Sequence, residues 1–215
     1  FGNIGDSSGD EMNLHMPQDE ESEAELKNLA AVPFQIISPA NNQSIIGIFQ
    51  DSLLGSYQFT RVGVKFDSRA AMNLLMALDT VNESMFSNVD GNLSNFQILS
   101  QIMPPITLKY KKKAFGEKED YNTSNNVLEI RDGQYLRGQL DKAVLGSGTN
   151  GLIHRTCNDF NNMTSAKFID DLQNIITEYM KVSSYSVGIS DLIANAETNN
   201  KIAEVIVSKK RMLRD

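Results

Sequence analysis

The sequence has one cysteine, two histidines and no long apolar run. The single cysteine, Cys157, excludes an internal disulfide framework and is typical of a protein from a reducing compartment. His15 and His154 are 139 residues apart, so together with one cysteine they do not form a zinc motif. No stretch reaches the roughly 18 apolar residues that a membrane helix needs, so we expect no membrane partner.

The amino terminus lacks an export signal and an initiator methionine. No charged segment followed by an apolar one is present near residue 1, so we expect no signal peptide. The first residue is Phe1, from which we expect the chain to be a piece of a longer protein. With 215 residues, 40% of them hydrophobic, the chain is long enough to bury a sizeable core in one or two domains.

Basic residues are scarce in the first part of the chain. Acidic residues outnumber basic ones 27 to 20, and this net charge of −7 excludes a generic basic nucleic-acid coat. Residues 1–60 hold nine acidic side chains and one basic one, Lys27, whereas the remainder holds 18 acidic and 19 basic side chains. The acidity therefore belongs to the front of the chain.

The spacing of apolar residues predicts helices, mainly in the last third of the chain. One helix is expected to start at Ser22, where a capping-box pattern begins. Further helices are expected over 68–78, about 164–181 and about 197–213. Ile202, Val205 and Ile206 are expected to face inward, so that the last two helices form a hairpin.

Extended segments and loops are predicted for the middle of the chain. Residues 33–39 are expected to be extended between two prolines, and 127–136 to form a β-hairpin around Asp132-Gly133. The apolar run 45–54 is expected to turn at Gly55 into a short helix. Loops are expected at 82–95, 109–126 and 146–151. Together these elements predict an α+β protein, with an irregular mixed sheet and loop region followed by a two-helix hairpin.

The most informative stretch, Gly9 to Gln18, reads Gly-Asp-Glu-Met-Asn-Leu-His-Met-Pro-Gln. Periodicity does not explain it. It resembles the segment that closes the active-site loop in the largest subunit of multisubunit DNA-directed RNA polymerases, whose pattern is N-A-D-F-D-G-D-E-M-N-x-H-x-P-Q. Ten consecutive residues follow that pattern.

The resemblance continues, in the order of the family, to the end of the chain. The similar segments are Glu25-Leu26, Val32-Pro33, Gln35-Ile36, Ser38-Pro39, Gly47-Ile48, Gln50-Asp51, the stretch 97–100, Asp132-Gly133-Gln134, Gly146-Ser147, 151–154 and 186–191. The resemblance implies the end of the active-site region over 1–60, a pore region over 61–150 and funnel helices over 151–215. The variable stretches look like those of a large-DNA-virus or divergent eukaryotic enzyme, which implies the nucleus or a cytoplasmic viral factory.

The resemblance implies a role in transcription. In this family three loop aspartates bind a catalytic Mg²⁺, and the RNA 3′-oxygen attacks the α-phosphate of an incoming nucleoside triphosphate. The implied partners are other polymerase subunits, the DNA template, the RNA product, nucleoside triphosphates and a transcript-cleavage factor at the funnel. Because positioning supplies much of phosphoryl-transfer catalysis, the chain alone is expected to be inactive.

The front of the motif departs from the family pattern. Aligned without gaps, Asp6 and Asp10 fall on the first and third aspartates and Gly9 on the glycine. Asp10 is thus the candidate catalytic residue, and Asp10 and Asp6 are the candidate metal ligands. Ser8 replaces the middle aspartate and removes one carboxylate ligand. The altered front is either foreign sequence joined to a truncated domain, which leaves only Asp10 as a family ligand, or a natural divergent motif.

Two other functions remain open. The first is a non-catalytic homologue that keeps the pore and funnel and binds a cleavage factor, an inhibitor or another subunit, because such a protein tolerates Ser8. The second is an unrelated acidic α+β binding domain, for which the ordered matches would have to be chance. Reading the gene upstream of Phe1 separates a truncated catalytic subunit from a non-catalytic homologue.

The remaining patterns favour structural roles. The lysines over 109–113 could contact phosphates, although a solvated loop is the commoner interpretation. The glycine-rich loop 146–151 lacks the Lys-Ser/Thr of a P-loop. Residues 6–10 lack the regular acids of a calcium loop and the base of a serine protease. His15 and His154 are expected to be structural.

Overall fold

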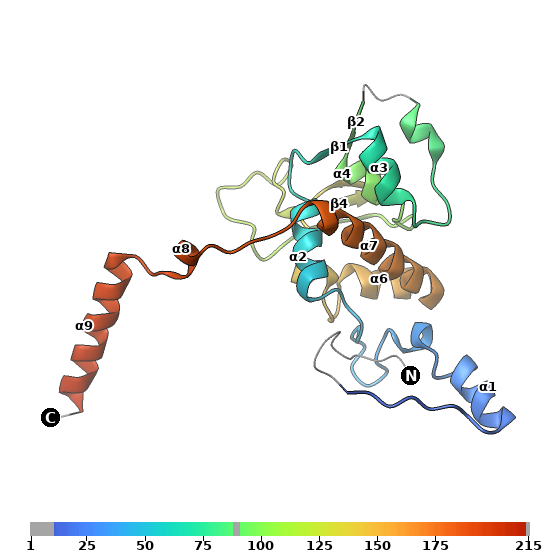
Figure 1. Ribbon diagram of the computed structural model, residues 1–215, viewed down its shortest axis with the longest axis horizontal. Coiled ribbons are helices and arrows are strands. Elements are labelled where there is room, and N and C mark those ends of the chain that lie inside the picture. Colours follow the sequence, from blue (N-terminus) through green and yellow to red (C-terminus); the bar gives the residue numbers. More distant parts are fainter. Residues whose placement is uncertain (1–10, 88–90, 214–215) are drawn as a thin grey trace. The chain divides into compact units, whose positions relative to one another are not determined.

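The computed structural model describes residues 11–87 and 91–213 (Figure 1). The chain divides into two compact units, Phe1–Val182 and Ser183–Asp215. Helices predominate, with short strands in small sheets, which confirms the predicted α+β class. In the part of the chain that the structure describes, none of the helices is both long and apolar enough to cross a membrane.

The first unit contains most of the secondary structure. Its helices are α1 (Glu20–Asn28), η1 (Val32–Gln35), α2 (Gln50–Phe59), α3 (Ser68–Leu75), η2 (Glu83–Phe86), α4 (Asn95–Ser100), α5 (Lys142–Leu145), α6 (Leu152–Asp159) and α7 (Asn162–Val182). Its strands are β1 (Lys65–Asp67), β2 (Asn92–Ser94), β3 (Leu108–Lys111), β4 (Val127–Arg131) and β5 (Gln134–Arg137). The helices predicted at Ser22, 68–78 and 164–181 correspond to α1, α3 and α7.

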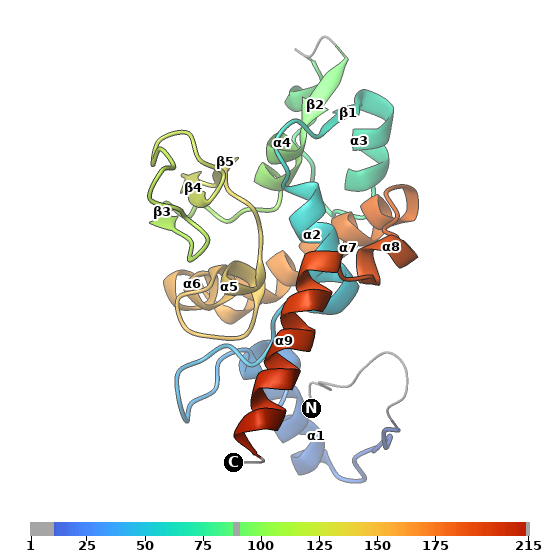
Figure 2. The same ribbon diagram turned by 90° about the vertical axis from the view of Figure 1, so that its left-hand side faces the viewer.

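The strands form two small antiparallel sheets. One pairs β1 with β2, and the other has the order β3-β4-β5, whose strands lie together in Figure 2. Strands β4 and β5 are joined by Asp132 and Gly133, whose φ angles are 47° and 73°. Two successive positive φ values are typical of the tight turns that match the twist of a hairpin. The predicted β-hairpin is confirmed.

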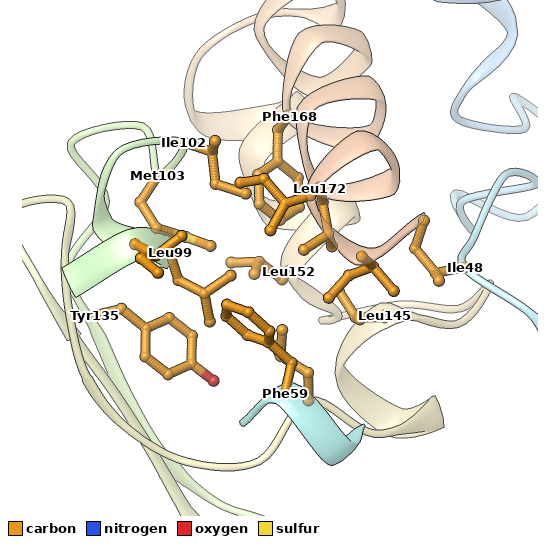
Figure 3. Close-up of a cluster of buried hydrophobic side chains, with 14 of the residues drawn as sticks. Ile48, Phe59, Leu99, Ile102, Met103, Tyr135, Leu145, Leu152, Phe168 and Leu172 are labelled. Carbon is orange, nitrogen blue, oxygen red and sulfur yellow. The ribbon is translucent and has the colours of Figure 1, made fainter. Parts of the chain in front are cut away.

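The core of the first unit is organised around α7. This helix packs against α2, α3 and α6 and buries the residues Phe168, Leu172, Ile175, Ile176 and Tyr179. The Phe59 ring of α2 meets the Tyr179 ring edge to face, with the ring centroids 5.1 Å apart. Phe59 and Leu172 lie within the apolar cluster of Figure 3. The helical spacing of the α7 residues thus has a direct structural cause, because one face is buried along the whole helix.

Gly55 lies inside α2, so the predicted turn at this residue is wrong. The glycine faces α7, where a Cβ atom would lie 2.6 Å from Cγ2 of Ile176 and 2.8 Å from Cγ of Met180. The lack of a side chain therefore lets the two helices approach closely. Here the glycine serves helix packing, and the helix continues to Phe59.

Other differences from the predictions concern short segments. Residues 33–39 are not extended throughout, because Pro33 lies in the first turn of the 3-10 helix η1, and only Ile37 forms a bridge, to Ser44. The predicted loop 82–95 contains η2 and β2. The lysine-rich stretch begins as strand β3, paired with β4, where a loop was expected.

The second unit contains α8 (Ile189–Leu192) and α9 (Ala196–Met212), and α9 corresponds to the helix predicted over 197–213. Neither helix has a buried residue. Ile202, Val205 and Ile206 are about half exposed, so their expected burial is not found. Within the second unit, α9 has no core against which its apolar residues could be buried. The hairpin of the last two long helices stays a prediction.

Replacing Gly55 with alanine is expected to destabilise the chain by about 1–2 kcal/mol. Overpacking against Ile176 and Met180 costs about 1–3 kcal/mol and outweighs the ~1 kcal/mol that alanine gains in a helix. Urea denaturation of the purified chain measures this. Gly116→Ala is the matched control, since a Cβ there makes only ordinary contacts. An unchanged or raised stability of Gly55→Ala would contradict the close packing of α2 on α7.

Candidate functional site

The two candidate metal ligands, Asp6 and Asp10, lie outside the described residues. The described part of the motif starts at Glu11 and runs without helix or strand to Pro17. Its apolar side chains are strongly exposed, Leu14 fully so. Across residues 11–87 and 91–213, no three His, Cys, Asp or Glu side chains come together to hold a metal ion. These residues therefore form no metal centre by themselves, and the Mg²⁺ site stays a prediction.

Helix α1 follows the motif directly and has a regular start. The Asp19 side chain accepts a hydrogen bond from the backbone N–H of Ser22, at 2.7 Å, and caps the helix. Glu20, Glu21 and Glu23 occupy the first turn, where negative charge is favourable. The acidic front of the chain is thus partly explained by helix capping, without any metal.

Two of the segments that resemble the polymerase family, Gly47-Ile48 and Gly146-Ser147, meet in one place, although they are about a hundred residues apart in sequence. The stretch 44–48 contacts the glycine-rich stretch 145–148, which we call the motif junction. The backbone N–H of Ile48 donates to the carbonyl of Leu145 at 2.9 Å. The N–H of Gly148 donates to Oγ of Ser44 at 3.1 Å, and the Ser44 N–H donates to the Gly148 carbonyl at 3.3 Å. The junction thus ties the segment after α1 to the core.

The junction requires a glycine at position 47. A Cβ there would lie 2.7 Å from the backbone nitrogen of Ser147 and 2.9 Å from the carbonyl carbon of Gly146. Backbone atoms cannot give way as a flexible side chain can. Gly47 is therefore explained by close backbone approach across the junction, and Gly146 by its own turn, where a Cβ would collide with the carbonyl oxygen of Lys142.

His154 is structural, as predicted. Its ring is buried at the start of α6, and Nε2 donates to the carbonyl oxygen of Asn42 at 2.9 Å. Asn42 has a φ of 51°, a conformation that asparagine tolerates better than most residues. His154 thus fixes the loop that precedes the junction.

The lysines in β3 and directly after it have partners within the protein. Lys112 is buried, and its Nζ lies 3.2 Å from a carboxylate oxygen of Asp141 and donates to the Gln139 carbonyl at 3.0 Å. Nζ of Lys109 and of Lys111 lies 4.8 Å and 5.4 Å from the centroid of the Tyr121 ring. The predicted solvated loop is wrong for the residues of β3 and for the buried Lys112, whereas Lys109, Lys111 and Lys113 are exposed as expected. These interactions favour a structural role over phosphate binding.

Arg137 and Glu129 hold the lysine-rich loop to the sheet. Nε and Nη2 of Arg137 donate to Oε2 of Glu129 at 2.9 and 2.8 Å, and the guanidinium also donates to the carbonyls of Tyr121 and Ser124. The hydrogen bonds from Arg137 hold the pKa of Glu129 below its usual value. Both side chains are largely buried, so removing either one would leave the charge of the other buried without this partner.

Tyr110 is a buried tyrosine whose hydroxyl has no hydrogen-bond partner in the described part of the chain. Burial raises its pKa to about 12. The guanidinium carbon of Arg155 lies 5.5 Å from the ring centroid. The phenol therefore stays neutral at physiological pH and does not act as a base.

Asn95 is a buried polar residue that the sequence-based reasoning missed. Its Nδ2 donates to the carbonyls of Phe59, at 2.6 Å, and Arg61, at 2.9 Å. Between them, Oγ1 of Thr60 accepts from the N–H of Leu140 at 2.9 Å. The sequence feature that could have indicated this residue is the capping-box pattern that starts at Ser94. Ser94 caps α4, so Asn95 is the first residue of that helix.

The Glu129→Gln variant is expected to lose about 2 kcal/mol of stability at neutral pH, because it removes the charge that Arg137 binds. The lowered pKa of Glu129 stabilises the fold above the unfolded value of about 4.5 and this stabilisation is lost as the pH falls through the folded value. The difference in the free energy of unfolding between wild type and Glu129→Gln should therefore shrink as the pH falls through the folded-state pKa of Glu129.

Urea denaturation at a series of pH values measures both effects. Glu117→Gln, at an exposed position on the same loop, is the matched control and should leave stability unchanged. Equal stabilities of Glu129→Gln and Glu117→Gln at neutral pH would contradict the role of Glu129.

Comparison with known proteins identifies similar chains. Residues 35–192 match the family described as RNA polymerase Rpb1, domain 3. Similar relatives are the DNA-directed RNA polymerase II subunits RPB1-A and RPB1-B of Trypanosoma brucei brucei, each 30% identical over 208 residues. The alignment covers 96% of this chain but 12% of each relative, so the chain spans about an eighth of their length.

Proposed function

Since the chain belongs to the Rpb1 family, the largest subunits of multisubunit RNA polymerases, we propose that it contributes to the nucleotidyl-transfer centre and to the pore and funnel of such an enzyme. The observation that carries the proposal is the motif from Gly9 to Gln18, which aligns Asp10 with the third aspartate of the family pattern. In this proposal residues 1–60 end the active-site region, 61–150 form the pore and 151–215 hold the funnel helices.

Asp10 and Asp6 are the proposed Mg²⁺ ligands. Carboxylate oxygens are hard ligands that suit this ion. When bound, Mg²⁺ stabilises the charge that develops on the phosphate oxygens. The residues of this chain supply the carboxylates and the backbone that carries them, and the motif junction fixes the segment that follows α1.

The partners follow from the same proposal. They are the other polymerase subunits, the DNA template, the RNA product, nucleoside triphosphates and a transcript-cleavage factor. The proposed location is the nucleus, as for an RNA polymerase II subunit. A large-DNA-virus origin, with a cytoplasmic viral factory as the location, stays a prediction. Because most of the length of the relatives lies outside this chain, the chain alone is expected to be inactive.

A non-catalytic homologue is the alternative, and Ser8 favours it. A serine at the position of the middle aspartate removes a charged ligand, which weakens Mg²⁺ binding. The loss of a ligand is what a subunit that only binds other proteins would tolerate. The gene sequence upstream of Phe1 discriminates between the two functions.

Asp10→Asn in the full-length subunit, assembled with its partner subunits, is expected to lower RNA extension at least about a hundredfold. The substitution removes a charged ligand from the proposed Mg²⁺ site. Extension of a primed template with nucleoside triphosphates measures the effect. Glu20→Gln, at an exposed acid in the same acidic segment, is the control and should retain activity.

The outcomes separate the two functions. Activity in the wild type that survives Asp10→Asn contradicts the proposed metal role of Asp10. An assembled wild-type enzyme that extends no RNA favours the non-catalytic homologue.

A further inference from the structure

The segment between α3 and β2 has a hollow on each side of it. We call residues 77–87 of this segment the strap, which leaves α3, loops outward and returns toward β2 in Figure 1. A groove with a volume of ≈ 730 Å³ lies between the strap and α3, and a pocket of ≈ 160 Å³ lies between Thr80 of the strap and the buried Phe168 of α7. The strap therefore lacks the close packing that fixes a core element in one position.

The strap is also poorly buried. None of residues 77–87 is buried, and its apolar side chains pack against the core only in part; these are Leu78, Val81, Met85 and Phe86. Helix α7, by contrast, buries one face along its whole length. Because segments with few buried contacts open at a lower free energy than the core does, we expect the strap to open while the core stays folded.

Two polar bonds tie the strap to the neighbouring helices. The Asp79 carboxylate accepts from Nζ of Lys167 in α7 at 2.7 Å, and the Asn82 N–H donates to Oε1 of Gln101, which caps the end of α4, at 3.0 Å. Across residues 11–87 and 91–213, no other polar bond links the strap to α4 or α7. The Asp79 side chain is 83% exposed and that of Lys167 is 50% exposed, so water competes with this ion pair and makes it a weak tie.

Lys167 has a second carboxylate partner, which does not move with the strap. Oδ2 of Asp171 lies 3.3 Å from Nζ of Lys167, four residues further along α7. The Asp171 side chain is 13% exposed and belongs to the helix that carries the core. If the strap moves away, Lys167 keeps the Asp171 carboxylate, so its charge is not left without a partner. Lys167 is therefore shared between a fixed acid and an acid on the strap.

We propose that the strap opens and closes as one unit over the pocket beside α7, and that Lys167 is the latch. In the closed state Lys167 binds Asp79 and Asp171 together, and in the open state it binds Asp171 alone. Opening exposes the pocket and Phe168 to solvent. This motion does not depend on Asp10 or on nucleotidyl transfer, so it is tested separately from the proposed function.

Hydrogen exchange at the Asn82 amide, relative to the core amide of Leu172, tests the proposal in the purified chain. We expect Asn82 to exchange faster than Leu172, because opening of the strap breaks its bond to Gln101. Asp79→Asn keeps the shape of the side chain but removes its charge, and should accelerate exchange at Asn82 about threefold. This effect reaches Asn82 from three residues away only if the strap opens as one unit. Raising the salt concentration should act in the same direction.

A substitution at the second acid gives the opposite sign. Asp171→Asn removes the competing partner of Lys167 and strengthens its bond to Asp79, so exchange at Asn82 should slow about twofold. Glu178→Gln is the matched control, since Glu178 is paired with Lys181 on the same helix, and it should leave the Asn82 rate unchanged. The proposal is overturned if Asn82 exchanges as slowly as Leu172. It is also overturned if Asp79→Asn has no effect, or if Asp171→Asn does not slow exchange.

Discussion

The buried face of α7 is the interaction on which the first unit depends. Phe168, Leu172 and Ile176 bring α2, α3 and α6 onto one helix, and Gly55 allows α2 to approach it closely. Close packing of this kind fixes each neighbouring element in one position. The β1-β2 sheet lies against α3, the β3-β4-β5 sheet lies against α4, and Asn95 of α4 binds the end of α2.

The motif junction also fixes the position of a segment nearer the amino terminus, the stretch 44–48. Ile36 and Ile48, both in the segment after α1, lie in the apolar cluster, and Leu145, whose carbonyl accepts from the Ile48 N–H, is buried beside Ile48 (Figure 3). At the motif junction, the backbone of Gly47 and Ile48 lies against the backbone of the stretch 145–147. This close approach explains the glycine at position 47 physically.

Much of the fold could be predicted from local patterns. The spacing in α7 and the Asp132-Gly133 turn act within a few residues, so the sequence alone was sufficient to predict them. The features that the sequence did not predict depend on distant partners. Gly55 is explained by α7, the burial of Lys112 by its ion pair with Asp141, and the role of Asn95 by the end of α2. Of the candidate site, the family motif was recognisable, but Asp6 and Asp10 lie outside the described residues.

The central claim is that the segment after α1 is fixed to the α7 core by the motif junction. Hydrogen exchange of the purified chain tests it most directly, because backbone amides that open only with the core exchange slowly. The amide protons of Ile45 and Ile48, which donate to Ile36 and Leu145, should be protected to the same degree as that of Leu172. Exchange at Ile45 and Ile48 as fast as at the exposed Leu14 would contradict the account.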